Sequence, residues 1–181
     1  MKTWIVAGLV CLVVSACTAG AGEPGNASTL ASSTDRNDCP VTIPPQPGFV
    51  PPAPYPPEPP FGQVWYGRAE LWTHLDPNGD VWRDLPVEKD GSIFNKTLWF
   101  SESFPSAAEG DFAGRDRVTL TAVRLDGSAP TVVEHSQGMP GFRRDIKHFE
   151  LVGLVLPKPG CWEVTAGYRG AELAYVLQVE G

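Results

Sequence analysis

The chain from Phe61 onward alternates short runs of β-forming residues with turns of glycine, proline and aspartate. In residues 116–125 (DRVTLTAVRL) apolar residues alternate with threonine, and residues 171–179 (AELAYVLQV) alternate in a similar way. Successive side chains of a strand point to opposite faces, so strict alternation predicts strands that bury one face. In the last strand we expect the buried face to carry Leu173, Tyr175, Leu177 and Val179.

Further strands are expected at five other runs of aromatic and β-branched residues: 69–75, 92–100, 131–136, 148–156 and 161–168. The segment DPNGD between the first two runs indicates a hairpin turn, and no stretch has the period of an amphipathic helix. Seven or eight short strands predict an all-β domain over residues 61–181, an antiparallel immunoglobulin-like sandwich of two sheets. A small closed barrel is the alternative.

Two segments of different composition precede this domain. Residues 17–38 begin with Cys17, and the residues after it are mostly small and polar. This composition is typical of a disordered, flexible tether. Residues 39–60 are rich in proline and would form an extended polyproline II rod if they were free. Such a rod can act as a spacer or as a PxxP ligand, whereas a covalent tie at Cys39 would make it a strap that returns along the domain.

The first 16 residues have the features of a signal peptide. Lys2 gives a positive start, and residues 4–16 form a continuous apolar run. That run is shorter than the roughly 20 apolar residues of a membrane-spanning helix, and it has the length of the apolar region of an export signal. We therefore expect residues 1–16 to be removed after export.

The end of this segment, Val14-Ser15-Ala16-Cys17, resembles the lipobox of bacterial lipoproteins. The resemblance implies that Cys17 receives a diacylglycerol, that the peptide before it is cleaved, and that the new amino group is acylated, for example with palmitate. Two or more acyl chains hold a protein firmly on a membrane. We expect a lipid-anchored protein on the extracytoplasmic side of the cell membrane or outer membrane; a secreted protein and an uncleaved anchor are the alternatives.

Two of the four cysteines remain once Cys11 is removed and Cys17 is lipidated. In an oxidising space such a pair normally forms a disulfide, and Cys39 and Cys161 allow one intramolecular pairing. Neither lies in a CxxC motif or near a histidine at zinc-ligand spacing, and no motif marks a nucleophile. The bond would stabilise the fold by about 4–5 kcal/mol in the chain-entropy model. A free thiol or an intermolecular bond is the alternative.

The strand that carries Cys161 also predicts where the strap lies. Because successive side chains alternate between faces, Trp162, Val164 and Ala166 should face the core. Cys161 should then lie on the outer face or at the start of the strand, where Cys39 can reach it. From this we expect the strap to lie across the outside of the sheet.

The C-terminal stretch PKPGCWEVTAGYRGAELAYVLQV, residues 157–179, resembles the ending of a group of bacterial exported proteins and lipoproteins. Residues 64–82 and 96–100 also resemble segments of that group, so that the likeness covers about half of the domain. No assigned activity comes with the group. The resemblance implies an exported β-domain and adds no catalytic residue.

The charge of the chain limits its partners. The sequence has 14 basic and 21 acidic residues; removing Lys2 with the signal peptide leaves 13 against 21, so the net charge changes from −7 to −8. Phosphate backbones would repel such a domain, and no basic run with interleaved aromatics is present, so we expect no nucleic-acid partner. The expected partners are the membrane, through the lipid anchor, and an envelope protein or glycan.

Candidate chemistry is sparse. Asp76, Asn78 and Asp80 alternate as at the start of an EF-hand loop, but the glycine stands at loop position 4 and Val87 at position 12, so a turn is favoured over a calcium site. The histidines, His74, His135 and His148, fall on separate predicted strands, and no GxSxG or phosphate-binding loop appears. We expect no metal, no cofactor and no catalytic residue. The alternative is an envelope hydrolase or metal-dependent enzyme whose dispersed histidines and acids the fold assembles.

Aromatic residues gather around one predicted turn: Trp65, Tyr66, Trp72 and Trp82. Large aromatics of a small sandwich usually lie in its core, and an exposed aromatic shelf that stacks on sugars or docks a protein is the other interpretation. The sequence as a whole therefore predicts a membrane-anchored, non-catalytic domain that binds or supports another envelope component, with these four residues as the candidate binding surface.

Overall fold

The computed structural model describes residues 39–105, 116–137, 141–143 and 147–181. This part of the chain is all-β, with one short 3-10 turn, η1 (Pro60–Gly62), and no α-helix. The predicted signal peptide 1–16, the lipidation site Cys17 and the tether 17–38 lie outside the described residues. No helix in the described part of the chain has the length and apolarity that crossing a membrane requires.

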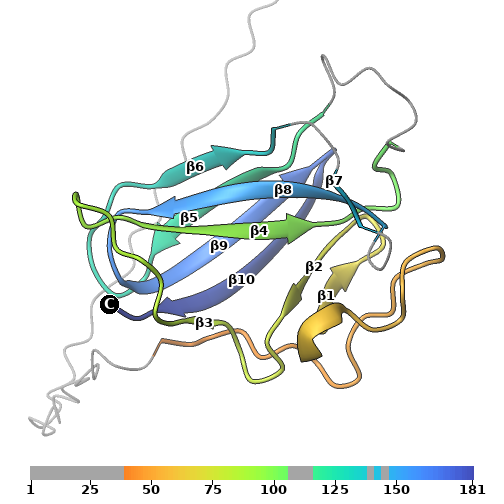
Figure 1. Ribbon diagram of the computed structural model, residues 1–181, viewed down its shortest axis with the longest axis horizontal. Helices are drawn as coiled ribbons and strands as arrows, with labels where there is room; N and C mark the ends of the chain where they lie inside the picture. The colour runs from red at the N-terminus through yellow and green to blue at the C-terminus, as the bar shows by residue number, and fades with distance from the viewer. Residues whose placement is uncertain (1–38, 106–115, 138–140, 144–146) are drawn as a thin grey trace, which may run out of the picture. The chain divides into compact units, whose positions relative to one another are not determined.

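The strands form three sheets (Figure 1). The five-stranded sheet has the order β3 (Val81–Trp82), β10 (Ala171–Val179), β9 (Gly160–Tyr168), β5 (Thr119–Arg124) and β6 (Val132–His135). The three-stranded sheet has the order β4 (Ile93–Trp99), β8 (Lys147–Leu156) and β7 (Gly141–Arg143). The hairpin of β1 (Val64–Arg68) and β2 (Leu71–Leu75) is the third sheet.

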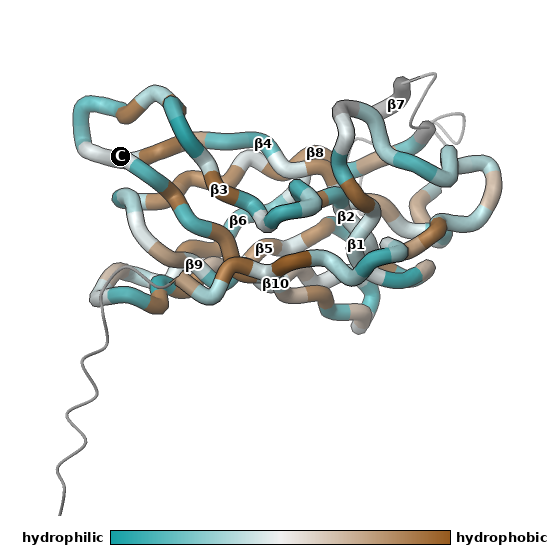
Figure 2. Tube along the Cα trace, turned by 90° about the horizontal axis from the view of Figure 1, so that it is seen from below, coloured by the Kyte–Doolittle hydropathy of each residue, from teal (hydrophilic) through white to brown (hydrophobic). Residues whose placement is uncertain are grey.

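The two larger sheets form layers that share one core (Figure 2). Buried residues from β4 and β8 pack in a single cluster with buried residues from β5, β9 and β10. The alternation read from the sequence decides which side chains enter this cluster. The members of the cluster from β5, β9 and β10 are Leu120, Ala122, Trp162, Val164, Ala166, Tyr168, Tyr175, Leu177 and Val179. The predicted core faces of β5, β9 and β10 are thereby confirmed, with Leu173 partly buried against the same core.

The closing hairpin of β9 and β10 turns through Arg169 and Gly170, whose φ angles are 49° and 82°. A two-residue turn with both central residues at positive φ matches the twist of the strands it joins. Gly170 adopts this conformation without steric cost, because it has no Cβ. The "RG" between two alternating runs is therefore what brings Tyr168 opposite Ala171.

The structure differs from the prediction in the number and direction of strands. The described residues form ten strands instead of seven or eight, and β3 runs parallel to β10. The segment 76–80 does turn, with a hydrogen bond of 2.9 Å from the Gly79 N–H to the Asp76 carbonyl. The hairpin prediction for this segment is wrong, because β3 pairs with β10 instead of β2. A two-residue strand has no periodicity to reveal it.

The strap, residues 39–60 (orange in Figure 1), starts at Cys39 on the outer face of the sheet but reaches the free edge of β10 by Thr42, so it does not continue across the sheet as expected. The Thr42 N–H donates to the Val176 carbonyl at 2.9 Å, and the Val176 N–H donates to Thr42 Oγ1 at 2.8 Å. Farther along this edge, the Tyr66 hydroxyl donates to the Ala174 carbonyl at 3.0 Å. At the C-terminal end of β10, β3 pairs with Gln178 and Val179 on the same edge. The strap, Tyr66 and β3 together cover an edge that could otherwise pair with another chain.

Candidate functional site

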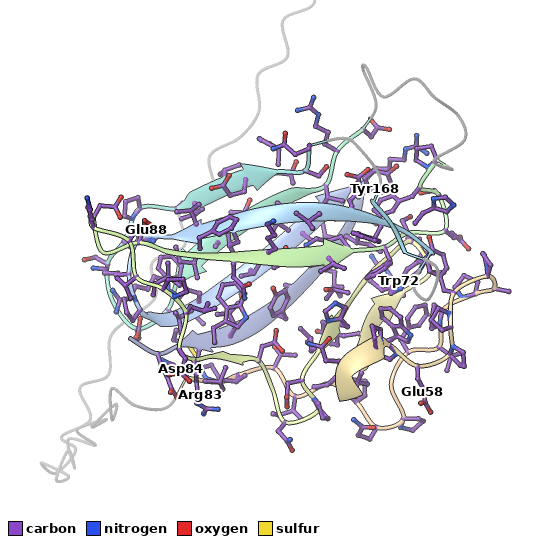
Figure 3. All side chains as sticks on the ribbon, viewed as in Figure 1. Glu58, Trp72, Arg83, Asp84, Glu88 and Tyr168 are labelled. Carbon is purple, nitrogen blue, oxygen red and sulfur yellow. A yellow bond between two sulfur atoms is a disulfide. The ribbon has the colours of Figure 1, made fainter. Side chains whose placement is uncertain are left out.

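The aromatic residues that suggested a shelf do not share one exposed surface. Trp65 is 1% exposed and Trp72 is 0% exposed, and both belong to a second buried cluster with Phe100 and Phe149. We call these four residues the aromatic cluster. Trp65 and Trp72 are therefore interior residues and not part of an exposed shelf (Figure 3 labels Trp72).

The strap covers the aromatic cluster with aromatic residues of its own. The Tyr55 ring meets Trp72 edge-on at 4.9 Å between centroids, and Phe49 lies 5.6 Å from Trp72. Hydrogen bonds fix this arrangement: the Trp65 indole donates to the Pro56 carbonyl at 3.0 Å, and the Tyr55 hydroxyl donates to the His148 carbonyl at 3.1 Å. The surface that these tryptophans could have offered to a ligand is thus occupied by residues 49–56 of the same chain.

Trp82 lies elsewhere, on β3, where it is half-buried against the main core. It lines a cavity of about 510 Å³ that we call the side cleft. The cleft lies beside β3, the edge strand of the five-stranded sheet, and reaches Asn95 on β4, an edge strand of the other sheet. Its lining residues are Gln63, Asp76, Asn78, Gly79, Asp80, Val81, Trp82, Arg83 and Asn95.

Asp80 is the residue of the side cleft with the most unusual environment. Its Oδ1 accepts a hydrogen bond of 2.7 Å from the Asp76 N–H, while Asp76 Oδ1 accepts one of 2.8 Å from the Asn78 N–H. Burial raises the pKa of Asp80 from 3.8 to about 6; the Asp76 hydrogen bond opposes this shift and the Asp76 charge adds to it. The Asp80 charge in turn raises the pKa of Tyr175, although burial of that phenol is the larger cause. A mostly buried carboxylate at neutral pH is a costly feature that often marks a functional site.

Arg83 and Asn95 supply hydrogen-bond donors to the side cleft, whereas Gln63 carries a buried acceptor. Arg83 lies on the outer side of β3 (Figure 3), where its Nε bonds Glu180 at 2.9 Å and its other N–H groups stay exposed. Asn95 Oδ1 accepts from the Lys96 N–H at 2.8 Å, which leaves the NH2 group of Asn95 as a donor. Gln63 Oε1 is buried without a hydrogen-bond partner in the described residues. An unpaired buried acceptor destabilises a fold by about 1–3 kcal/mol.

The three histidines lie in different surroundings. His74 packs between Trp65 and Phe100, and burial lowers its pKa to about 4, a shift that a backbone hydrogen bond opposes in part. His135 is exposed on β6, with its Nδ1 3.0 Å from Thr119 Oγ1. His148 lies on β8. Within the ranges that the structure describes, no group of three or more His, Cys, Asp or Glu side chains could hold a metal ion.

The Cys39–Cys161 disulfide is present, with a Cα–Cα distance of 5.4 Å. Cys161 is 2% exposed and is the second residue of β9. Because its neighbour Trp162 faces the main core, Cys161 lies on the opposite face, as the alternation predicted. The bond ties the first residue of the strap to the centre of the five-stranded sheet.

Comparison of the chain with protein-family models, with curated proteins and with solved structures gave no match. The side cleft was not predicted from the sequence, because Gln63 and Asn95 reach it from segments that only the topology brings to Asp80. One signal was available: Asp76, Asn78 and Asp80 stand within the six residues before Trp82, so acidic, amide and aromatic groups are concentrated in seven residues.

Proposed function

We propose that the protein is a lipid-anchored extracytoplasmic lipoprotein whose immunoglobulin-like domain binds another component of the cell envelope without catalysis. Residues 1–16 act as its signal peptide, Cys17 carries the lipid, and residues 18–38 connect the lipid to the domain. The lipobox-like sequence Val14-Ser15-Ala16-Cys17 supports the anchor.

The disulfide between Cys39 and Cys161 is the observation that carries this proposal. Such bonds persist in oxidising compartments and are rare in a reducing cytosol. The lipobox and the disulfide are independent features, one at the N-terminus and one within the fold, and both favour export. A domain that starts at the disulfide and follows a polar stretch of about 20 residues suits a protein held on a membrane by its N-terminus.

The immunoglobulin-like assignment is supported by two mostly antiparallel sheets that meet over one core, with a buried tryptophan on a central strand. That strand is β9, and the tryptophan is Trp162. Sandwich domains of this kind commonly serve as rigid supports for binding surfaces. The binding surface that we assign is the side cleft, because it combines a cavity with a carboxylate that is buried at a cost in stability.

The test of this proposal is metabolic labelling with an alkyne fatty acid, read by in-gel fluorescence on cells that express the full chain. The wild-type protein should be labelled and should sediment with membranes, while Cys17→Ser should be unlabelled, because a hydroxyl does not replace the thiol in the lipid transfer. Cys11→Ser is the matched control, since it removes a thiol from the signal peptide without touching the lipidation site. Equal labelling of the wild type and Cys17→Ser would contradict the proposal.

A further inference from the structure

The side cleft offers hydrogen-bond acceptors and donors next to an aromatic ring. Acceptors come from Asp80 and Asp76, each with one carboxylate oxygen engaged by a backbone N–H of its own turn. Donors come from Asn95 and from the N–H groups of Arg83 that Glu180 does not engage. Trp82 forms part of the wall and is held from behind by the main core.

The size and polarity of the side cleft restrict the class of ligand. Its volume of about 510 Å³ lies within the roughly 300–1,000 Å³ of small-molecule sites. Such sites are usually apolar with a few polar groups, whereas this cleft is lined mainly by carboxylates, amides and a guanidinium. A ligand that fits must therefore present many groups that both donate and accept hydrogen bonds. Sugar hydroxyls do both, and the apolar face of a sugar ring can stack on an indole.

The charge around the side cleft restricts the class of saccharide that it can bind. Two carboxylates, Asp76 and Asp80, line the cleft, and Glu180 neutralises its arginine. The mature chain also carries an expected net charge of −8 (13 basic and 21 acidic residues). Anionic saccharides would be repelled by this field, while a neutral saccharide would not.

We propose that the side cleft binds a neutral glycan, with Trp82 stacking on a sugar ring and Asp80 accepting hydrogen bonds from its hydroxyl groups. This inference rests on the proposed function, because the cleft meets envelope glycans only if the protein is exported. It names the component that the domain binds. The bound unit is a short saccharide, since the cleft has a volume of about 510 Å³.

The probe is a printed array of neutral glycans (glucans, mannans, galactans and chitin oligomers) and anionic glycans (uronic, sulfated and phosphorylated), incubated with the detergent-solubilised full-length lipoprotein. At least one neutral glycan should bind, and its affinity should fall roughly tenfold or more in Trp82→Ala and in Asp80→Asn, because each variant removes a main contact. Phe94→Ala and Glu163→Gln are the matched controls. Both residues are exposed outside the cleft, and both variants should bind as the wild type does.

The variants also separate lost binding from lost folding. Asp80→Asn removes a buried charge and should raise the melting temperature, so weaker binding by this variant cannot come from unfolding. The proposal is overturned if no neutral glycan binds, if anionic glycans bind better, or if both cleft variants bind as the wild type does. Loss of binding in EDTA would also overturn it, since the cleft would then act through a cation. Fatty-acid labelling of the same preparation reports the proposed function separately, so failure of one does not imply failure of the other.

Discussion

Replacement of Asp80 by asparagine should stabilise the protein at neutral and alkaline pH. Burial raises the pKa of Asp80 from 3.8 to about 6, so the folded state prefers the neutral form of this carboxyl. As the pH rises from about 4 to 6, the unfolded chain loses the proton first, and the folded state loses stability relative to it. Asparagine is neutral at every pH and keeps an oxygen to accept the Asp76 N–H.

The magnitude follows from the shift. A change of about 2.2 units at 1.36 kcal/mol per unit gives about 3 kcal/mol above pH 6. At pH 4, where Asp80 is protonated in the folded state, the same substitution should change stability by less than about 1 kcal/mol. For a domain of about 150 residues, 3 kcal/mol corresponds to roughly 6–10 °C in melting temperature.

The assay is urea unfolding of the wild type, Asp80→Asn and the control Glu163→Gln at pH values from 4 to 8. The difference between the wild type and Asp80→Asn should grow with pH between about 4 and 6 and stay constant above. Glu163 is exposed, so its substitution should leave the profile unchanged. An Asp80→Asn variant that is no more stable than the wild type at pH 8 would refute the reasoning, because the carboxylate could then not be destabilised by burial.

Three further predictions concern the histidine, the strap and the aromatic cluster. The pKa of His74 is lowered to about 4 by burial, so the unfolded chain takes up the proton first as the pH falls below 6.5, and this histidine costs stability down to pH 4. Because Asp80 changes stability in the opposite direction over the same pH range, the effect is read as a difference between variants: from pH 7 to pH 4.5 the wild type and His135→Gln should each lose about 2–3 kcal/mol more than His74→Gln does. Trp72→Ala should lower stability by about 3–5 kcal/mol in urea unfolding, because the residue is fully buried, and an unchanged midpoint would place it outside the core. Cys161→Ser should remove up to about 5 kcal/mol and should release the strap before the core melts, so that chymotrypsin cleaves after Phe49 under native conditions; an equally protected strap would contradict its dependence on the disulfide.

Predictions from the sequence succeeded where a strand is long and buries one face. β10 begins and ends at the predicted residues, 171 and 179, because the run starts directly after a glycine turn and its core-facing residues recur at every second position. β9 is predicted nearly as well, and its alternation also placed Cys161 and Trp162 on opposite faces. β3 and β7, with two and three residues, are too short to have a readable period.

The aromatic shelf illustrates a different limit. Trp65 and Trp72 were candidates for a binding surface because they lie close to one predicted turn, and the proline-rich composition of residues 49–56 gives no sign that this segment covers them. Proline prevents regular strand pairing but does not prevent packing, and Phe49 and Tyr55 supply the apolar surface. The predicted disulfide fixes one end of the strap. It does not allow a prediction of which side chains lie beneath the other end.

The side cleft could not be predicted because it depends on how the two sheets are joined. The turn at 76–80 was expected to connect paired strands, but it carries the chain from β2 to the edge of β10. That crossing brings Asp80 beside Asn95, which is on the other sheet. A one-dimensional pattern does not distinguish a hairpin from such a crossing when the second strand has two residues.

The most direct test of the central claim is mass spectrometry of the protein purified from its own membranes, digested without reduction. The account predicts an N-terminal peptide that begins at Cys17 and carries a diacylglycerol and an acyl chain, together with a peptide in which Cys39 is linked to Cys161. A chain that retains residues 1–16, carries no lipid on Cys17 and has two free thiols at Cys39 and Cys161 would contradict it.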